Sequence, residues 1–110
     1  MTVAAEHLQE LAELCGEVRE ITEGGKIYIY LPRLRLPAGC VPSEVEGLLC
    51  VQEHSGYATR LFLSQLVNGR GANWSVHRVV DRTWHTWSWN NVSAQMRPAA
   101  ILAEHLRALR

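Results

Sequence analysis

Apolar residues recur at helical spacing near both ends of this chain. Close to the N-terminus, glutamates separate the apolar positions Val3, Leu8, Leu11, Leu14 and Cys15. This spacing predicts a first helix, with Thr2 available as its N-cap and Gly16 as its C-terminal stop. Close to the C-terminus, Pro98 suits the first turn of a second helix, whose apolar stripe consists of Ile101, Leu102, Leu106 and Leu109.

Between these helices the pattern changes to the period of β-strands. Residues 17–22 and 26–31 alternate polar and apolar side chains around Gly24 and Gly25, which predicts a β-hairpin. Two more apolar runs, within 45–53 and 59–63, follow a stretch broken by proline and glycine and predict a third and a fourth strand. We therefore expect a four-stranded antiparallel meander.

Residues 64–81 show turn chemistry and no period, so we expect a long irregular loop there. The predicted order is helix, four-stranded meander, long loop and helix, which is an α+β fold. No linker or internal repeat interrupts it, and 110 residues suffice for one hydrophobic core. The sequence predicts a single domain spanning residues 1–110.

Charge and hydropathy narrow the classes of partner. The 11 basic residues balance the 11 acidic ones, so no overall field draws the chain to nucleic acid or to an anionic membrane. The apolar runs are too short for a membrane span, and the N-terminus lacks the pattern of a secretion signal. We expect a cytoplasmic protein that binds neither nucleic acid nor membrane.

All four tryptophans, Trp74, Trp84, Trp87 and Trp89, lie within sixteen positions. One interpretation is a secondary aromatic core that attaches a loop to the sheet, because aromatic rings mostly serve packing. The other is a partner-binding surface, because tryptophan is enriched at the energetic centres of interfaces. Both interpretations stay open on the sequence alone.

Histidines and serines near the tryptophans suggest a hydroxyl activated by a base. His77 and His85 are the candidate bases, with Ser75, Ser88 and Asp81 nearby, although no nucleophile-elbow motif accompanies them. A zinc site formed by His54, His77 and His85 lacks the helical spacing and the thiolates of common sites. We therefore expect no metal and no cofactor.

The three cysteines, Cys15, Cys40 and Cys50, are an odd number without a Cys-x-x-Cys pair, so reduced thiols are the simplest interpretation. Cys15 belongs to the first helix and Cys50 to an apolar strand. Cys40 follows Gly39 in a loop and is the one we expect to be exposed. It is therefore the third candidate nucleophile, beside Ser88 and His85.

Three stretches together carry a family resemblance: 24–30 leading into 36–39, 45–63 with its Gly56-Tyr57 turn, and 84–88 followed by Arg97-Pro98. With the predicted element order, they make the chain resemble the ubiquitin-conjugating-enzyme (UBC-like) superfamily. The likeness is greater to a short bacterial branch encoded beside ubiquitin-like proteins. It extends over most of the chain, and the paired tryptophans with the downstream Arg-Pro are its most distinctive part.

The resemblance implies a UBC-like component of a bacterial ubiquitin-like conjugation system. Its implied partners are a ubiquitin-like protein, an activating enzyme and a JAB-type peptidase. The first helix and the Trp-rich segment would make the contacts, with Trp84, Trp87, Trp89 and Arg97 as binding residues.

One departure separates the chain from the conjugating enzymes it resembles. Those enzymes carry their cysteine after the fourth strand, whereas no cysteine follows Phe62 here. The chain is thus either a non-catalytic adaptor or an atypical transferase that uses Ser88, Ser75 or a histidine. The alternatives from other classes are a small-molecule or peptide-binding module that uses the Trp-rich loop, and a structural subunit of a larger assembly.

Overall fold

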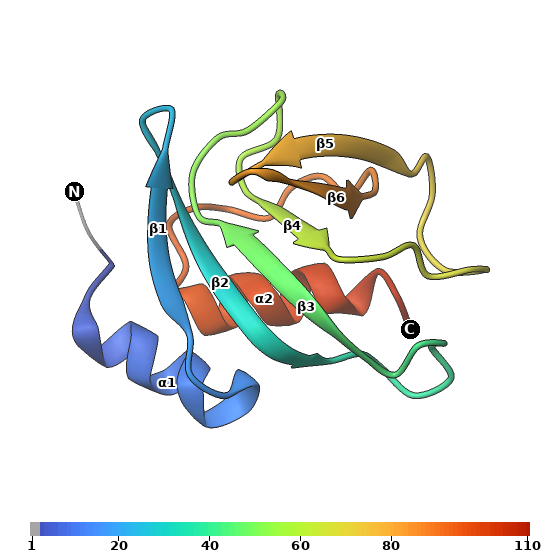
Figure 1. The fold of residues 1–110 in the computed structure, drawn as a ribbon, viewed down its shortest axis with the longest axis horizontal. Helices are drawn as coiled ribbons and strands as arrows, with labels where there is room; N and C mark the ends of the chain where they lie inside the picture. Colours follow the sequence, from blue (N-terminus) through green and yellow to red (C-terminus); the bar gives the residue numbers. More distant parts are fainter. Residues whose placement is uncertain (1–2) are drawn as a thin grey trace.

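The protein has an α+β fold with one helix near each end of the chain (Figure 1). The structure is a computed structural model that describes residues 3–110. Its elements are α1 (Ala5–Cys15), β1 (Arg19–Glu23), β2 (Lys26–Arg35), β3 (Glu44–Cys50), β4 (Arg60–Leu63), β5 (Ser75–Val79), β6 (Arg82–Thr86) and α2 (Pro98–Arg107). The expected cap Thr2 lies outside the described residues. Ala4 occupies the N-cap position and offers no side-chain hydrogen bond.

The strands form one antiparallel sheet of six strands in the order β1-β2-β3-β4-β6-β5. The predicted meander corresponds to β1–β4, and β2 runs on to Arg35 with a register shift between Leu31 and Leu34. The prediction of a loop throughout 64–81 was wrong, because Ser75–Val79 is a strand. It forms a hairpin with β6, which lies inside the Trp-rich stretch.

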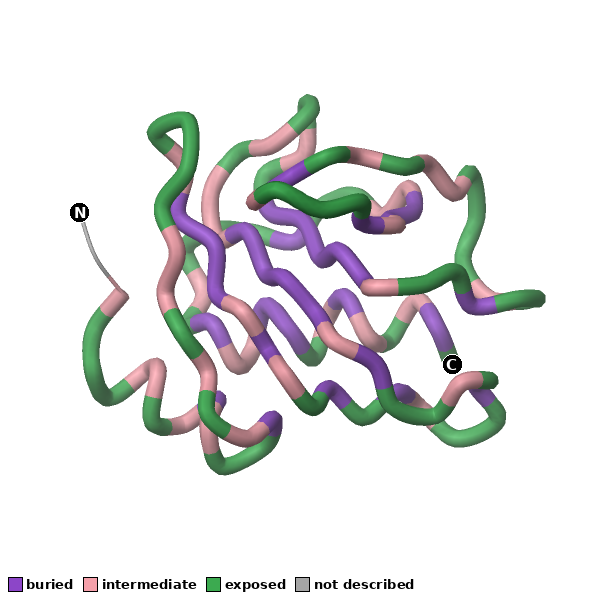
Figure 2. The backbone as a smooth tube through the Cα atoms, in the orientation of Figure 1, coloured by how far each residue is buried: buried purple, intermediate pink, exposed green. Residues whose placement is uncertain are grey.

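Both helices pack against the same face of the sheet. In Figure 1, α2 lies behind β2 and β3, and α1 lies at the lower left, beside β1. Alternate residues of the central strands point to this face. The core there contains Leu11 and Cys15 from α1, Ile29, Leu31, Leu49, Leu61 and Leu63 from the strands, and Ile101 and Leu102 from α2. Figure 2 shows the buried central strands above the buried stripe of α2.

The opposite face of the sheet carries a second, smaller core. Strands β5 and β6 are the last two of the sheet, and their hairpin folds back over this core. Its buried members are Tyr28, Leu48, Cys50, Phe62, Val79 and Trp84. The hairpin is fixed over this face by polar contacts with distant strands: Arg82 pairs with Glu46 of β3 at 2.9 Å, and the Val80 backbone N–H donates to the Glu23 carboxylate of β1 at 3.0 Å. The sheet is therefore covered on both faces.

Leu14 departs from the predicted apolar stripe of α1. Leu11 and Cys15, one turn apart, are buried, whereas the side chain of Leu14 is 63% exposed. Successive residues of a helix are rotated by about 100° around its axis, so Leu14 points away from the buried face on which Cys15 lies. This leaves a large apolar side chain beside α2 in solvent.

No helix among residues 3–110 has both the length and the apolar character needed to cross a bilayer.

Candidate functional site

Trp84 and Trp87, which the sequence offered as binding residues, are 1% and 2% exposed. The Trp84 indole N–H donates to the carbonyl oxygen of Val79 at 3.0 Å. The ring of Trp87 lies 5.1 Å from that of Trp74, and its own N–H has no hydrogen-bond partner in the described part of the chain. Gly71, at a φ of 72°, approaches both of these rings closely. This arrangement favours the aromatic-core interpretation for Trp84 and Trp87.

The other two predicted binding residues link chain segments. Trp89 is partly buried and donates from its indole N–H to the carbonyl oxygen of Glu104 at 3.0 Å, which ties the segment after β6 to α2. Arg97 is exposed, and its Nε lies 3.1 Å from a carboxylate oxygen of Glu10. This ion pair joins the start of α2 to α1.

His85 and Ser88, two of the candidate catalytic residues, are not hydrogen-bonded to each other. His85 lies opposite Leu63 and Val76 in the sheet. The Ser88 hydroxyl instead accepts a hydrogen bond from the Tyr57 hydroxyl at 3.0 Å. Residues three apart on an extended chain point to opposite sides, so the local backbone keeps the imidazole and this hydroxyl separate.

Ser75 and His77 are in contact. Two residues apart on β5, they share a face, and Ser75 Oγ lies 3.2 Å from His77 Nε2. Burial lowers the pKa of His77, and the positive charge of Arg60 lowers it further. The imidazole is therefore neutral at pH 7 and can accept a proton.

The three histidines considered for zinc are divided between the two faces of the sheet. The rings of His54 and His77 are 5.8 Å apart. His85 pairs with Val76, which precedes His77 and therefore points to the opposite face. Within residues 3–110, no group of three His, Cys, Asp or Glu side chains is arranged to hold a metal ion.

The three cysteines are all buried, so the expectation that Cys40 is exposed was wrong. The loop that carries Cys40 packs against the end of the chain, and its Sγ lies 3.3 Å from the carbonyl oxygen of Leu109. Burial raises the pKa of Cys15 to about 11 and also raises that of Cys50. Buried thiols of this kind are poor nucleophiles at neutral pH.

Arg60, at the start of β4, is a site residue that the sequence reasoning missed. Its side chain is almost fully buried and its guanidinium carbon lies 4.1 Å from the centre of the Tyr57 ring. His54 and His77 lie on the same side of the sheet, each with its ring against Phe62. The available signal was a cation directly before the apolar run Leu-Phe-Leu, since an arginine in a buried strand is uncommon.

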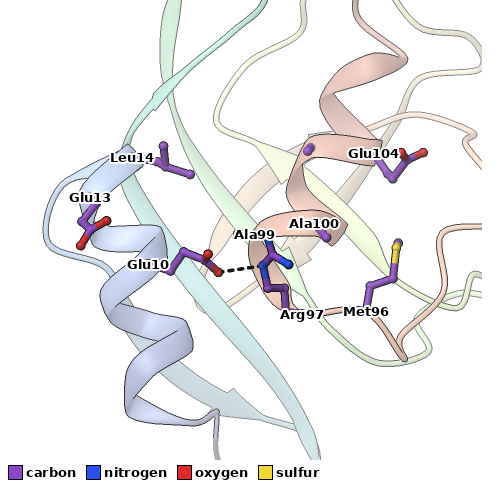
Figure 3. Close-up of a pocket in the computed structure, with 9 residues that line it drawn as sticks. Glu10, Glu13, Leu14, Met96, Arg97, Ala99, Ala100 and Glu104 are labelled. Carbon is purple, nitrogen blue, oxygen red and sulfur yellow. Dashed lines mark hydrogen bonds and ion pairs between the residues drawn. The ribbon is translucent and has the colours of Figure 1, made fainter.

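A groove runs between α1 and α2 (Figure 3). Small side chains of α2, including Ala99 and Ala100, line its centre. Carboxylates and the apolar side chain of Leu14 surround it, and Arg97 reaches across it to Glu10, as the dashed line in Figure 3 marks. An apolar strip with acidic edges is a surface suited to binding a protein segment.

Comparison with protein-family models, with curated proteins and with solved structures gives no match for this chain.

Proposed function

We propose that this chain is a non-covalent binding component of a bacterial ubiquitin-like modification system, with a UBC-like fold. The observation that carries the proposal is the burial of all three thiols. The helix near each end of the chain and the antiparallel strands between them support it, since the resemblance implies such an order. A thioester needs an accessible thiolate. An adaptor that recognises the ubiquitin-like protein or its activating enzyme needs only a surface.

The groove between α1 and α2 is the proposed contact surface. The first helix was expected to bind the partner on grounds of resemblance, and Leu14 gives it an exposed apolar anchor at the groove. Glu13 adds negative charge beside that anchor, whereas the charge of Glu10 is balanced by Arg97. We therefore expect the partner to present an apolar side chain with basic residues around it.

A loading assay tests the absence of covalent chemistry. The chain is incubated with ATP, the activating enzyme and the ubiquitin-like protein, and the products are separated with and without thiol and with and without hydroxide. We expect no adduct under any condition. A thiol-labile adduct that disappears in Cys40→Ser would overturn the adaptor and restore Cys40 as nucleophile.

The contact between Ser75 and His77 favours a second candidate, an atypical transferase. Ser75 Oγ would attack the activated C-terminal carbonyl of the ubiquitin-like protein, and His77 would take the hydroxyl proton. The bond from this carbonyl to the group that activates it would break, and that group would leave. The product is an oxyester, which resists thiol and is cleaved by hydroxide. Such an adduct in the same assay, lost in Ser75→Ala and kept in Ser88→Ala, would establish this candidate and overturn the adaptor.

A small-molecule or peptide-binding module that uses the Trp-rich loop is the alternative from another class. The burial of Trp84 and Trp87 weighs against it, because neither ring is presented to solvent. A metabolite library that shifts tryptophan fluorescence, without any response to a ubiquitin-like protein, would favour this module instead.

A further inference from the structure

Arg60 is a buried cation without a partner of opposite charge. The residue is 5% exposed, its Nε has no hydrogen-bond partner, and no carboxylate among residues 3–110 lies within ion-pairing distance of its guanidinium. Arginine stays protonated in proteins, and a buried charge is costly unless it is paired. The charge of Arg60 is therefore available to a bound anion.

The surroundings of Arg60 hold its guanidinium in place. Its guanidinium carbon lies over the Tyr57 ring, 4.1 Å from the ring centre. Tyr57 is itself fixed, because its hydroxyl donates to Ser88 at 3.0 Å. A guanidinium held in this way loses little freedom when it binds an oxyanion.

Two imidazoles lie on the same face of the sheet as this cation, close enough for its positive charge to lower the pKa of both. Phe62 follows Arg60 by two residues on β4 and so points to the same face of the sheet. Its ring centre is 5.0 Å from that of His54 and 5.7 Å from that of His77. Both histidines are only partly buried, so they connect the enclosed arginine with solvent.

Each imidazole has one ring nitrogen left for a ligand. His54 Nδ1 contacts Ser55 Oγ at 2.6 Å, and His77 Nε2 contacts Ser75 Oγ at 3.2 Å. When the serines donate these bonds, the protons reside on His54 Nε2 and His77 Nδ1. Neither of these two nitrogens has a hydrogen-bond partner in the described part of the chain.

Nearby charges make this region electropositive. The carboxylate of Glu53 is engaged by the Lys26 ammonium at 3.3 Å and by the backbone N–H of Gly56 at 2.8 Å. The pKa of His54 is lowered by burial and then by His77, Lys26 and Arg60. A bound anion would counteract these positive charges and so raise the pKa of His54.

We propose that Arg60, His54 and His77 form a binding site for a phosphate group, carried by inorganic phosphate or by a small phosphate monoester. The donors come from β4, from the β3–β4 loop and from β5, so three separate segments of the chain would contact the ligand. This suits a tetrahedral oxyanion with three or more acceptor oxygens. A carboxylate has two oxygens in one plane, which the arginine alone would satisfy.

Calorimetric titration of the full chain with inorganic phosphate, at constant ionic strength, tests the site. We expect saturable one-to-one binding that weakens at least about tenfold in Arg60→Met, since hydrogen bonds to charged groups contribute roughly 1.5–3 kcal/mol. Arg33→Gln is the matched control, because Arg33 is exposed and already has Glu44 as its partner. It should leave the affinity unchanged. Acetate should bind more weakly than phosphate, and comparison with O-phosphoserine distinguishes the free ion from a monoester.

Two further measurements, of the melting temperature and of the histidine pKa values, report on the site itself. Phosphate should raise the melting temperature of the wild type and not that of Arg60→Met, and it should raise the pKa of His54 and His77 in an NMR titration. If Arg60→Met does not fold, His54→Asn replaces it and should bind several-fold more weakly. Absence of saturable binding, equal binding of acetate, or unchanged affinity in the variant used would overturn the site.

Discussion

At the scale of single residues, Trp84 and Trp87 are equally enclosed but differ in one hydrogen bond. Trp84 donates to the carbonyl oxygen of Val79, whereas the N–H of Trp87 has no partner in the described part of the chain. Trp84→Phe should therefore lower the free energy of unfolding by about 1–2 kcal/mol more than Trp87→Phe does, because only Trp84→Phe removes a hydrogen bond. Urea unfolding of both variants measures this difference, and equal costs would contradict it.

His105 gives a pH dependence of stability. Its side chain is buried in α2, and its Nε2 lies 2.9 Å from Thr59 Oγ1, whose proton is donated to the carbonyl oxygen of Val92. The imidazole is therefore the donor, in its neutral Nε2–H form. Burial, and then the charge of Arg60, lowers the pKa of His105 to about 4.

The sign of the effect follows from this lowered pKa. The unfolded chain takes up a proton near pH 6.5, while the folded chain does not until about pH 4. The stabilising contribution of neutral His105 to the free energy of unfolding is thus complete above pH 6.5 and is lost as the pH falls to 4. At roughly 1.4 kcal/mol per pKa unit, this loss is about 3 kcal/mol. Urea unfolding at several pH values should show a flatter profile for His105→Gln than for the wild type. The same profile in both would contradict the assignment.

At the scale of elements, the turn between β5 and β6 uses unfavourable residues. Val80 and Asp81 have φ angles of 49° and 59°, as the central residues of a type I′ turn require. Asn adopts this backbone readily, and the β-branched Val does not. Val80→Asn should raise the free energy of unfolding by about 1 kcal/mol.

The matched control for this turn is Val76→Asn, at an exposed position of β5 with ordinary strand geometry. Here the same substitution should lower the free energy of unfolding by up to about 1 kcal/mol, because Asn is disfavoured in strands. Chemical unfolding of both variants compares the signs. A loss of stability in Val80→Asn would contradict the strain attributed to the turn.

The turn between β5 and β6 also illustrates why the sequence predicted some elements and missed others. Both helices and β1–β4 follow strong local periods with glycine or proline at their ends, and they were predicted correctly in type. The hairpin of β5 and β6 was missed because its two turn residues, Val80 and Asp81, do not include the glycine that usually marks such a turn. Its position depends on distant contacts, such as the one between Val80 and Glu23.

The candidate site was less predictable, since it depends on pairings across the sheet. The sequence offered several histidines and serines without pairing them. Only the strand register brings His77 to Ser75 and separates His77 from His85. The burial of Cys40 results from a contact with Leu109, far along the chain. The only local signal for Arg60 was its place directly before an apolar run, because its environment is assembled from β4, β5 and the loop after β3.

At the scale of the whole molecule, the two faces of the sheet have separate roles in this account. The helices and their groove form the proposed protein-binding side, and the face under the β5–β6 hairpin holds the proposed phosphate site. Leu14 is 63% exposed beside the groove, and Val76 is 61% exposed on β5. These two apolar side chains therefore serve as a matched pair for testing where a partner binds.

Binding of the ubiquitin-like protein to the groove is the central claim, and calorimetric titration of the two proteins tests it most directly. We expect saturable binding by the wild type and by Val76→Arg. Leu14→Arg should bind at least about tenfold more weakly, because a buried apolar anchor contributes 1.5–3 kcal/mol. Absence of binding by the wild type, or equal affinity of Leu14→Arg and Val76→Arg, would contradict it.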